Sequence, residues 1–199
     1  MKILATALLI CASYLGLNAQ VYLLGDKVIS FTLTNATDNT KISLADYSQS
    51  KGVVVVFTNN SCPYSKLYES RILGLAAEFQ SKDIRFILIN ALPNSQYPED
   101  QPMGMASRAK QNSYPFPYLV DADGSISKKF GATKSPESFL LKNINGSFVL
   151  YYKGAIDDNP QTANDVSSFY LKDAVYSLLN NTPIKVSERR ASGCMISVN

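Results

Sequence analysis

A buried strand that leads into a Cys-Pro pair is the feature that most restricts the fold of this sequence. Residues 53–57 (VVVVF) form a continuous apolar run, which predicts a strand buried on both faces of a sheet. Shortly afterwards Cys62 precedes Pro63, and proline suits the first position of a helix, where its missing N–H costs nothing. Cys62 is therefore predicted at a helix N-cap, where unpaired amides and the helix dipole favour the nucleophilic thiolate.

The first residues of the chain, 1–19, have the pattern of a secretory signal peptide. Lys2 is followed by an apolar stretch over 3–17, which is shorter than the roughly 20 residues that a membrane helix needs. We expect cleavage after Ala19 and export to the periplasm or the cell exterior, with no stable membrane span. Lipoprotein anchoring through Cys11 is disfavoured, because Ile10 stands where a lipidation signal has a small residue.

The cysteines of the mature chain are then Cys62 and Cys194. An even pair in an exported protein indicates either a disulfide or a redox couple. A bond between them would close a very long loop and fasten the tail to the domain. The same pair would also serve as a nucleophile and a distant resolving cysteine, and the sequence leaves both uses open.

The composition excludes several classes of function. The chain has no histidine, which excludes Ser-His-Asp and Cys-His catalysis and argues against a transition-metal site. The formal net charge of +3 is too small to indicate nucleic-acid or membrane-surface binding. We expect no metal and no organic cofactor. The length predicts one domain over 20–180, followed by a tail over 181–199 that resembles a linker around Cys194.

Hydrophobic periodicity and turn residues predict an α/β fold with a mixed sheet. The first two predicted strands form a hairpin, and a right-handed crossover joins the two central ones. A second hairpin turns at Asn145-Gly146, the strongest short hairpin signal. Strands are predicted at 28–34, 41–44, 53–57, 83–91, within 115–121, at 138–142 and at 148–153, and helices after Cys62, at 103–111, at 125–130 and around 171–178.

Five segments carry a resemblance to a known family. They are FTNNSCPYSKLYESRI (57–72), FPYLVDADG (116–124), FGATKSPESFLL (130–141), KGAIDDNPQ (153–161) and ASGCMISV (191–198). The chain resembles the thioredoxin-like redoxins related to alkyl hydroperoxide reductase and thiol-specific antioxidant proteins. The resemblance implies a thioredoxin fold, in which helices flank a mixed central β-sheet, with an N-terminal β-hairpin extension.

The active segment departs from that family in one respect. Members of the branch that these segments match most specifically usually have a cysteine where Asn59 stands, so the CxxC pair is broken and Cys62 remains alone. Ser65 likewise occupies the place of the second cysteine in a glutaredoxin-like Cys-Pro-Tyr-Cys motif. Cys62 is either the buried member of a lost pair or an exposed nucleophile. Its offset from Phe57 and the proline after it favour the exposed nucleophile.

The resemblance also implies a substrate-binding surface around Cys62. Pro136 stands where thioredoxin folds have a cis-proline that faces the active cysteine, and Ser135 would present backbone groups to an incoming peptide. Thr58 and Asn59 are candidates for hydrogen bonds near the sulfur, and Pro63 completes the candidate site.

A peroxidase of this family would have a threonine in place of Asn59 and a proline in place of Val55. Their absence weakens the interpretation of this chain as a peroxidase. The sequence therefore predicts a thiol–disulfide oxidoreductase or peroxiredoxin-like antioxidant protein. Its catalytic residues would be Cys62 and Cys194. Its substrate would be a protein disulfide, a small-molecule disulfide or a peroxide, and a reductase would be a further partner. The alternative is a non-catalytic binding or structural module stapled by a Cys62–Cys194 disulfide.

Overall fold

The computed structural model describes residues 20–90 and 96–196, and the predicted signal peptide lies outside this part of the chain. A mixed sheet of nine strands forms its centre, in the order β1-β9-β8-β4-β5-β6-β2-β3, with β10 beside β9. The strands are β1 (Lys27–Val28), β2 (Thr32–Asn35), β3 (Lys41–Ser43), β4 (Gly52–Thr58), β5 (Ile84–Asn90), β6 (Tyr118–Val120), β8 (Glu137–Ile144), β9 (Ser147–Gly154) and β10 (Glu188–Arg189). Two further strands, β7 (Lys134–Ser135) and β11 (Cys194–Met195), pair with each other.

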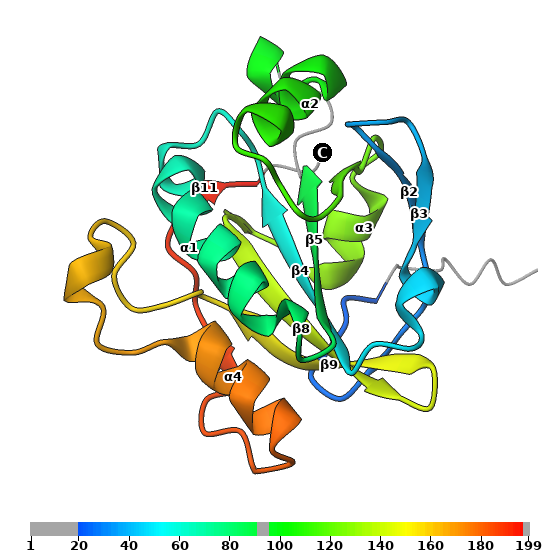
Figure 1. Cartoon of the computed structure of the whole chain (residues 1–199), viewed down its shortest axis with the longest axis vertical. Coiled ribbons are helices and arrows are strands. Elements are labelled where there is room, and N and C mark those ends of the chain that lie inside the picture. The colour runs from blue at the N-terminus through cyan, green and yellow to red at the C-terminus, as the bar shows by residue number, and fades with distance from the viewer. Residues whose placement is uncertain (1–19, 91–95, 197–199) are drawn as a thin grey trace, which may run out of the picture.

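The helices cover both faces of the sheet (Figure 1). They are α1 (Pro63–Gln80), α2 (Pro102–Gln111), α3 (Ser125–Phe130) and α4 (Tyr170–Leu179), with short 3-10 helices at Leu44–Tyr47, Pro98–Asp100 and Ala163–Asp165. Residues of α1, α2 and α4 pack into one hydrophobic cluster, and residues of α3 pack into the other. The predicted fold class, α/β with a mixed sheet flanked by helices, is confirmed.

The apolar run 53–57 lies in the central strand β4, and its position explains why apolar and polar residues do not alternate in it. Val54 and Val56 belong to the cluster beneath α1 and α4, whereas Val53, Val55 and Phe57 belong to the cluster beneath α3. All five side chains have 0% exposure, because helices or loops cover both sides of the strand. Strand β4 pairs in parallel with β5 and antiparallel with β8, so α1 is the predicted crossover helix.

The two predicted hairpins are also present. Strands β2 and β3 pair antiparallel and form the N-terminal extension. Strands β8 and β9 pair antiparallel around Asn145 and Gly146, whose φ angles of 53° and 82° place both residues in the left-handed region. Asn-Gly is favoured there because asparagine and glycine tolerate positive φ.

The C-terminal tail is not the linker that the sequence suggested. After α4, strand β10 of the tail pairs in parallel with the C-terminal end of β9, at Lys153 and Gly154. Strand β11 then pairs antiparallel with β7, which brings residues 194–195 of the tail beside the start of α1, as the red segment labelled β11 in Figure 1 shows. Among the described helices, none combines the length and hydropathy required to cross a bilayer.

Candidate functional site

Cys62 occupies the N-cap of α1, as predicted. Its φ and ψ of −75° and 123° are extended, and Pro63 takes the first position of the helix. The carbonyl oxygen of Cys62 accepts the first helical hydrogen bond, from the N–H of Lys66 at 3.3 Å. The sulfur therefore lies at the positive end of an 18-residue helix, which favours a thiolate once the sulfur is released.

Cys62 is joined to Cys194 by a disulfide. The two Sγ atoms are 2.07 Å apart, the Cα atoms are 5.9 Å apart, and the bond spans 132 residues of sequence. These values fall within the normal geometry of protein disulfides. The bond that the sequence allowed between Cys62 and Cys194 is therefore present in the structure, and it is compatible with either a structural or a redox use.

The tail reaches Cys62 by pairing with the strand that precedes Pro136. In strand β11, Cys194 stands opposite Ser135 and Met195 opposite Lys134. The peptide bond between Ser135 and Pro136 is cis, as the resemblance implied. The backbone of Ser135, which was predicted to receive a peptide, is thus paired with the protein's own tail.

Ser135 also contacts the sulfur of Cys62. Its carbonyl oxygen lies 3.1 Å from Cys62 Sγ. A sulfur in a disulfide carries no hydrogen, so this is a close polar contact and not a hydrogen bond. If the disulfide is reduced and Cys62 is protonated, its thiol can donate a hydrogen bond to the Ser135 carbonyl oxygen in this arrangement.

The remaining candidates form a buried polar network behind the sulfur. Asn59 Oδ1 accepts a hydrogen bond from the Ser135 hydroxyl, and Asn59 Nδ2 donates to Ser61 Oγ at 2.8 Å. Thr58 Oγ1 donates to Ser65 Oγ at 2.9 Å, and the hydroxyls of Ser65 and Ser135 are 2.8 Å apart. The side chains of Asn59 and Ser65, at the positions where related motifs have a cysteine, therefore both contact Ser135.

One residue of this network was not foreseen. Asp100, from the 3-10 helix before α2, has only 2% of its surface exposed. Its Oδ1 atom accepts hydrogen bonds from the backbone N–H groups of Asn60 at 2.6 Å and Ser61 at 3.1 Å. It thereby holds the loop that carries Cys62. Nothing in the sequence links Asp100 to this loop, because the two segments are far apart along the chain.

The exposure of the two cysteine residues corrects the expectation of an exposed nucleophile. Cys62 is 2% exposed, whereas Cys194 is half-buried. In this disulfide form the tail and the segment at Ser135 lie against the Cys62 sulfur. Cys194 is thus the more exposed of the two cysteines.

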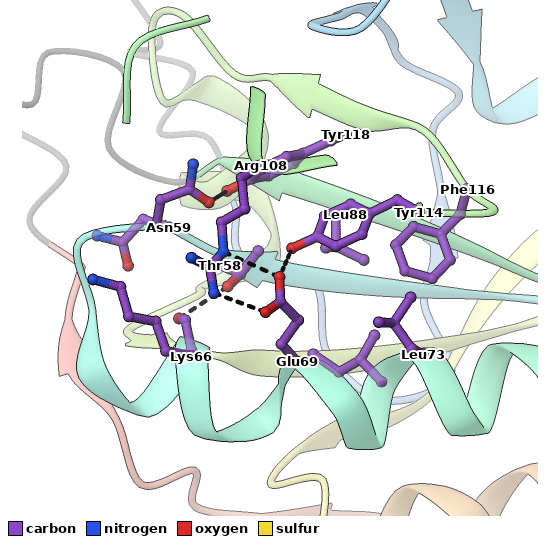
Figure 2. A pocket seen from close by; sticks show the side chains of 13 residues that line it. Thr58, Asn59, Lys66, Glu69, Leu73, Leu88, Arg108, Tyr114, Phe116 and Tyr118 are labelled. Atoms are coloured by element: carbon purple, nitrogen blue, oxygen red, sulfur yellow. Dashed lines mark hydrogen bonds and ion pairs between the residues drawn. The ribbon is translucent and has the colours of Figure 1, made fainter. Parts of the chain in front are cut away.

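A small cavity lies on the α1 side of this network (Figure 2). Glu69, Arg108 and Tyr114 point toward one another there, and Arg108 binds the Glu69 carboxylate through Nε at 3.0 Å and Nη2 at 2.7 Å. The Tyr114 hydroxyl donates to the same carboxylate, and burial raises the pKa of Tyr114. The free space is about 10 Å³, enough for one water molecule and too small for a substrate.

Asp157 and Asp158, a pair that could suggest a metal site, have other partners. Asp157 is buried and forms an ion pair with Arg71 at 2.8 Å, and it accepts a hydrogen bond from the Tyr68 hydroxyl at 2.8 Å. Asp158 accepts the N–H of Ser167 at 2.9 Å. Over residues 20–90 and 96–196, no cluster of three or more cysteine or carboxylate side chains could hold a metal ion.

The fold and the site together define a class of protein. A cysteine at the start of the helix that follows the central strand, facing a cis-proline loop, is the arrangement of thioredoxin-fold redox proteins. Residues 24–158 match the AhpC/TSA family, and the chain belongs to that family. The thioredoxin fold that the sequence predicted is thus confirmed. No curated protein matches the chain.

Solved structures share this fold. An uncharacterized conserved protein from Geobacillus kaustophilus is similar at 29% identity, with a TM-score of 0.80 over 89% of this chain and 93% of that chain. Peroxidoxin BcpB from Mycobacterium tuberculosis shares the fold at 19% identity, with a TM-score of 0.55 over 80% and 95% of the two chains. A thiol:disulfide interchange protein from a Bacteroides species does so at 14% identity, with a TM-score of 0.56 over 80% and 91%.

Proposed function

We propose that this protein is an exported thiol–disulfide oxidoreductase in which Cys62 is the nucleophile and Cys194 the resolving cysteine. The observation that carries the proposal is the disulfide between a cysteine at a helix N-cap and a cysteine on a two-residue strand of the tail. A bond whose one end lies on so short a strand can open without disturbing the central sheet. Family membership and the disulfide support thiol chemistry, and the signal-like residues 1–19 support export.

The oxidised protein would be reduced from the Cys194 side. An incoming thiolate attacks Sγ of Cys194, the more exposed residue of the pair, forming a mixed disulfide there, and Cys62 leaves as a thiolate at the helix start. A second thiol of the reductant, such as a dithiol reductase, then attacks the mixed disulfide. Cys194 is released as a thiol, and the reductant leaves oxidised.

The reduced protein would then act on a protein or small-molecule disulfide. The Cys62 thiolate attacks one sulfur of the substrate, and the other sulfur leaves as a thiolate. Cys194 attacks Cys62 Sγ, which releases the bound half of the substrate and restores the disulfide seen here. Two electrons thereby pass from the cysteine pair to the substrate.

Single-cysteine variants test this mechanism. Cys62→Ser should abolish the reduction of insulin disulfides, whereas Cys194→Ser should slow turnover and accumulate a mixed disulfide at Cys62 that mass spectrometry detects. Cys11→Ser is the matched control and should keep full activity. Undiminished activity of Cys62→Ser would reject the proposal. For export, N-terminal sequencing of the secreted chain should begin at Gln20, and retention of residues 1–19 would contradict cleavage.

A second function is favoured by the burial of the bond. Cys62 is 2% exposed and Asn59 replaces the usual second cysteine, so the disulfide could be a permanent staple in a non-catalytic module. The reduction potential separates the two functions. A value below about −300 mV is typical of a structural bond, and a more oxidising value of a redox bond.

A peroxide is the remaining candidate for the oxidant. Hydrogen peroxide would convert the Cys62 thiolate to a sulfenic acid, and condensation with Cys194 would form the disulfide and release water. The second-order rate constant of the reduced protein with hydrogen peroxide tests this reaction. The asparagine at position 59 removes the hydroxyl that would orient the peroxide, so we expect a slow reaction.

A further inference from the structure

The segment 191–196 lies on the domain as an extended peptide attached through its cysteine. It pairs with β7 through Cys194 and Met195, and the N–H of Ile196 donates to the carbonyl oxygen of Thr133 at 2.9 Å. These contacts use the backbone and do not select a sequence. Any extended segment with a cysteine in this register could make them.

Side chains, in contrast, distinguish this segment from others. Ala191 and Ile196 are 4% and 7% exposed, and Ile196 packs into the hydrophobic cluster beneath α3. Ser192 is exposed and Met195 is 64% exposed. The segment thus places a small and a branched apolar side chain into the domain on either side of its cysteine.

Gly193 sets the strictest requirement. A Cβ atom on this residue would lie 2.7 Å from the carbonyl carbon of Ser135, closer still to its oxygen, and 3.2 Å from the nitrogen of Pro136. These are backbone atoms, which cannot turn aside as the end of a flexible side chain can. Only glycine allows the residue before Cys194 to come this close to the cis-proline segment.

The tail is anchored separately further upstream. At Gly154, with φ of 124°, a Cβ atom would lie 2.7 Å from the carbonyl carbon of Arg189. The carbonyl oxygen of Arg189 accepts the N–H of Ala155 at 2.8 Å. Strand β10 is therefore an attachment of the tail that is separate from the disulfide and precedes residues 191–196.

We propose that residues 191–196 are a built-in copy of the peptide that this site accepts. The substrate is an extended protein segment with glycine immediately before its cysteine and an apolar side chain two positions after it. The inference rests on the proposed function, since it requires Cys62 to exchange disulfides. The segment is displaced when the substrate binds, and it displaces the substrate when Cys194 restores the bond.

The exchange balances without a further reagent. In the reduced protein, the Cys62 thiolate attacks the cysteine sulfur of a peptide disulfide, and the peptide's former partner leaves as a thiolate. The peptide then lies in the place of Gly193-Cys194, covalently bound to Cys62. Attack by Cys194 on Cys62 Sγ releases the peptide thiol, and a dithiol reductant restores the pair for the next cycle.

Peptide substrates test the proposal directly. The full chain with Cys11→Ser and Cys194→Ser has Cys62 as its only thiol. It is mixed with peptides of the sequence ASGCMIS, ASACMIS or AAGCMIS, each activated as a 2-thiopyridyl disulfide, and release of the thiopyridone gives the second-order rate constant. The second peptide carries the equivalent of Gly193→Ala, and the third carries the equivalent of Ser192→Ala, one position earlier.

The expected result is a rate for ASACMIS at least about tenfold below that for ASGCMIS, because the added methyl group meets backbone atoms. AAGCMIS should stay within about twofold of ASGCMIS, because Ser192 is exposed. Equal rates for all three peptides would overturn the inference and leave the proposed function intact. Failure of Cys62 to react even with a small aromatic disulfide would instead overturn the proposed function.

The same comparison in the unmodified tail gives an independent test. Gly193→Ala in the full chain should lower the equilibrium constant for Cys62–Cys194 formation at least about tenfold, which is about 30 mV for a two-electron couple. Ser192→Ala should leave that constant within about twofold. An unchanged constant for Gly193→Ala would show that the close approach does not select glycine.

Discussion

The carboxylate of Asp100 accepts a hydrogen bond from the backbone N–H of Asn60 at 2.6 Å, across 40 residues of sequence. The contact joins two loops that leave neighbouring parallel strands, β4 and β5, at the same edge of the sheet. Since the loop after β4 carries Cys62, the position of the sulfur depends on a side chain from the next crossover. The disulfide site is therefore supported by four segments: the loop 59–61, the turn at 98–100, the cis-proline strand and the tail.

We predict that Asp100→Ala destabilises the protein by about 3 kcal/mol. The change leaves the buried N–H group of Asn60 and the partly buried one of Ser61 without their charged acceptor, and the loss of an acceptor by a buried group costs about 1–3 kcal/mol. Urea denaturation of the oxidised protein measures the effect. Asp165→Ala, at an exposed position, is the control and should change the stability by less than about 0.5 kcal/mol. Equal effects of the two variants would show that Asp100 does not support the loop.

Glu137 should make stability depend on pH in the sense opposite to most carboxylates. Burial raises the pKa of Glu137 above 4.5, although the N–H groups of Thr133 and Lys134 partly offset this by donating to its carboxylate. The folded state then binds the proton more tightly than the unfolded state. The contribution of Glu137 to stability is full below the unfolded pKa and falls as pH rises through the folded pKa.

A comparison with Glu137→Gln isolates this contribution, because all other groups titrate equally in both proteins. The urea midpoint of the unmodified protein should decrease relative to that of Glu137→Gln as pH rises from about 4.5 to about 7. A difference that stays constant over this interval, or that changes in the opposite sense, would contradict the raised pKa.

The disulfide should contribute strongly to stability even if it is also catalytic. It closes a loop of 132 residues, for which the chain-entropy relation gives about 5 kcal/mol. Cys194→Ser should lose up to this amount relative to the oxidised protein, and the two should have equal urea midpoints once a reductant is present. Cys11→Ser should not change the midpoint. A persistent difference under reducing conditions would assign the loss to the serine substitution and not to the bond.

The sequence was most informative where structure depends on neighbouring residues. The N-cap position of Cys62 follows from an apolar run on one side and Pro63 on the other, and both signals are local. The Asn145-Gly146 turn is local in the same way, since these two residues tolerate the positive φ angles that it adopts. The family resemblance added the cis bond before Pro136, which no local pattern indicates.

The parts of the site that escaped prediction depend on contacts between distant segments. Strand β11 has only two residues, too few to show an alternation of apolar and polar side chains. The sequence of the tail therefore resembles a linker, although the tail pairs with β7. The polar partners of Asn59 and Asp100 belong to other loops, and polar residues in loops are more often solvated. The burial of Cys62 depends on the pairing of the tail with β7, and the residues near Cys62 do not predict this pairing.

Asp157 illustrates the same limit and supports a final prediction. Its carboxylate is 4% exposed and receives Arg71 Nη1 at 2.8 Å, joining α1 to the loop that follows β9. Removing one partner of a buried ion pair leaves the other charge uncompensated and costs about 3–5 kcal/mol. Asp157→Ala should therefore lower the unfolding free energy by about this amount, and Asp158→Ala, at the exposed neighbour, should lower it much less.

The double variant Asp157→Ala with Arg71→Met distinguishes an ion pair from simple packing. Methionine removes the stranded charge and keeps the aliphatic part of the side chain, so the double variant should recover part of the stability lost in Asp157→Ala. Urea denaturation of the two single variants and the double variant completes a thermodynamic cycle. Losses that merely add would show that Asp157 and Arg71 act independently, and the short contact between them would then contribute nothing to joining α1 to the loop.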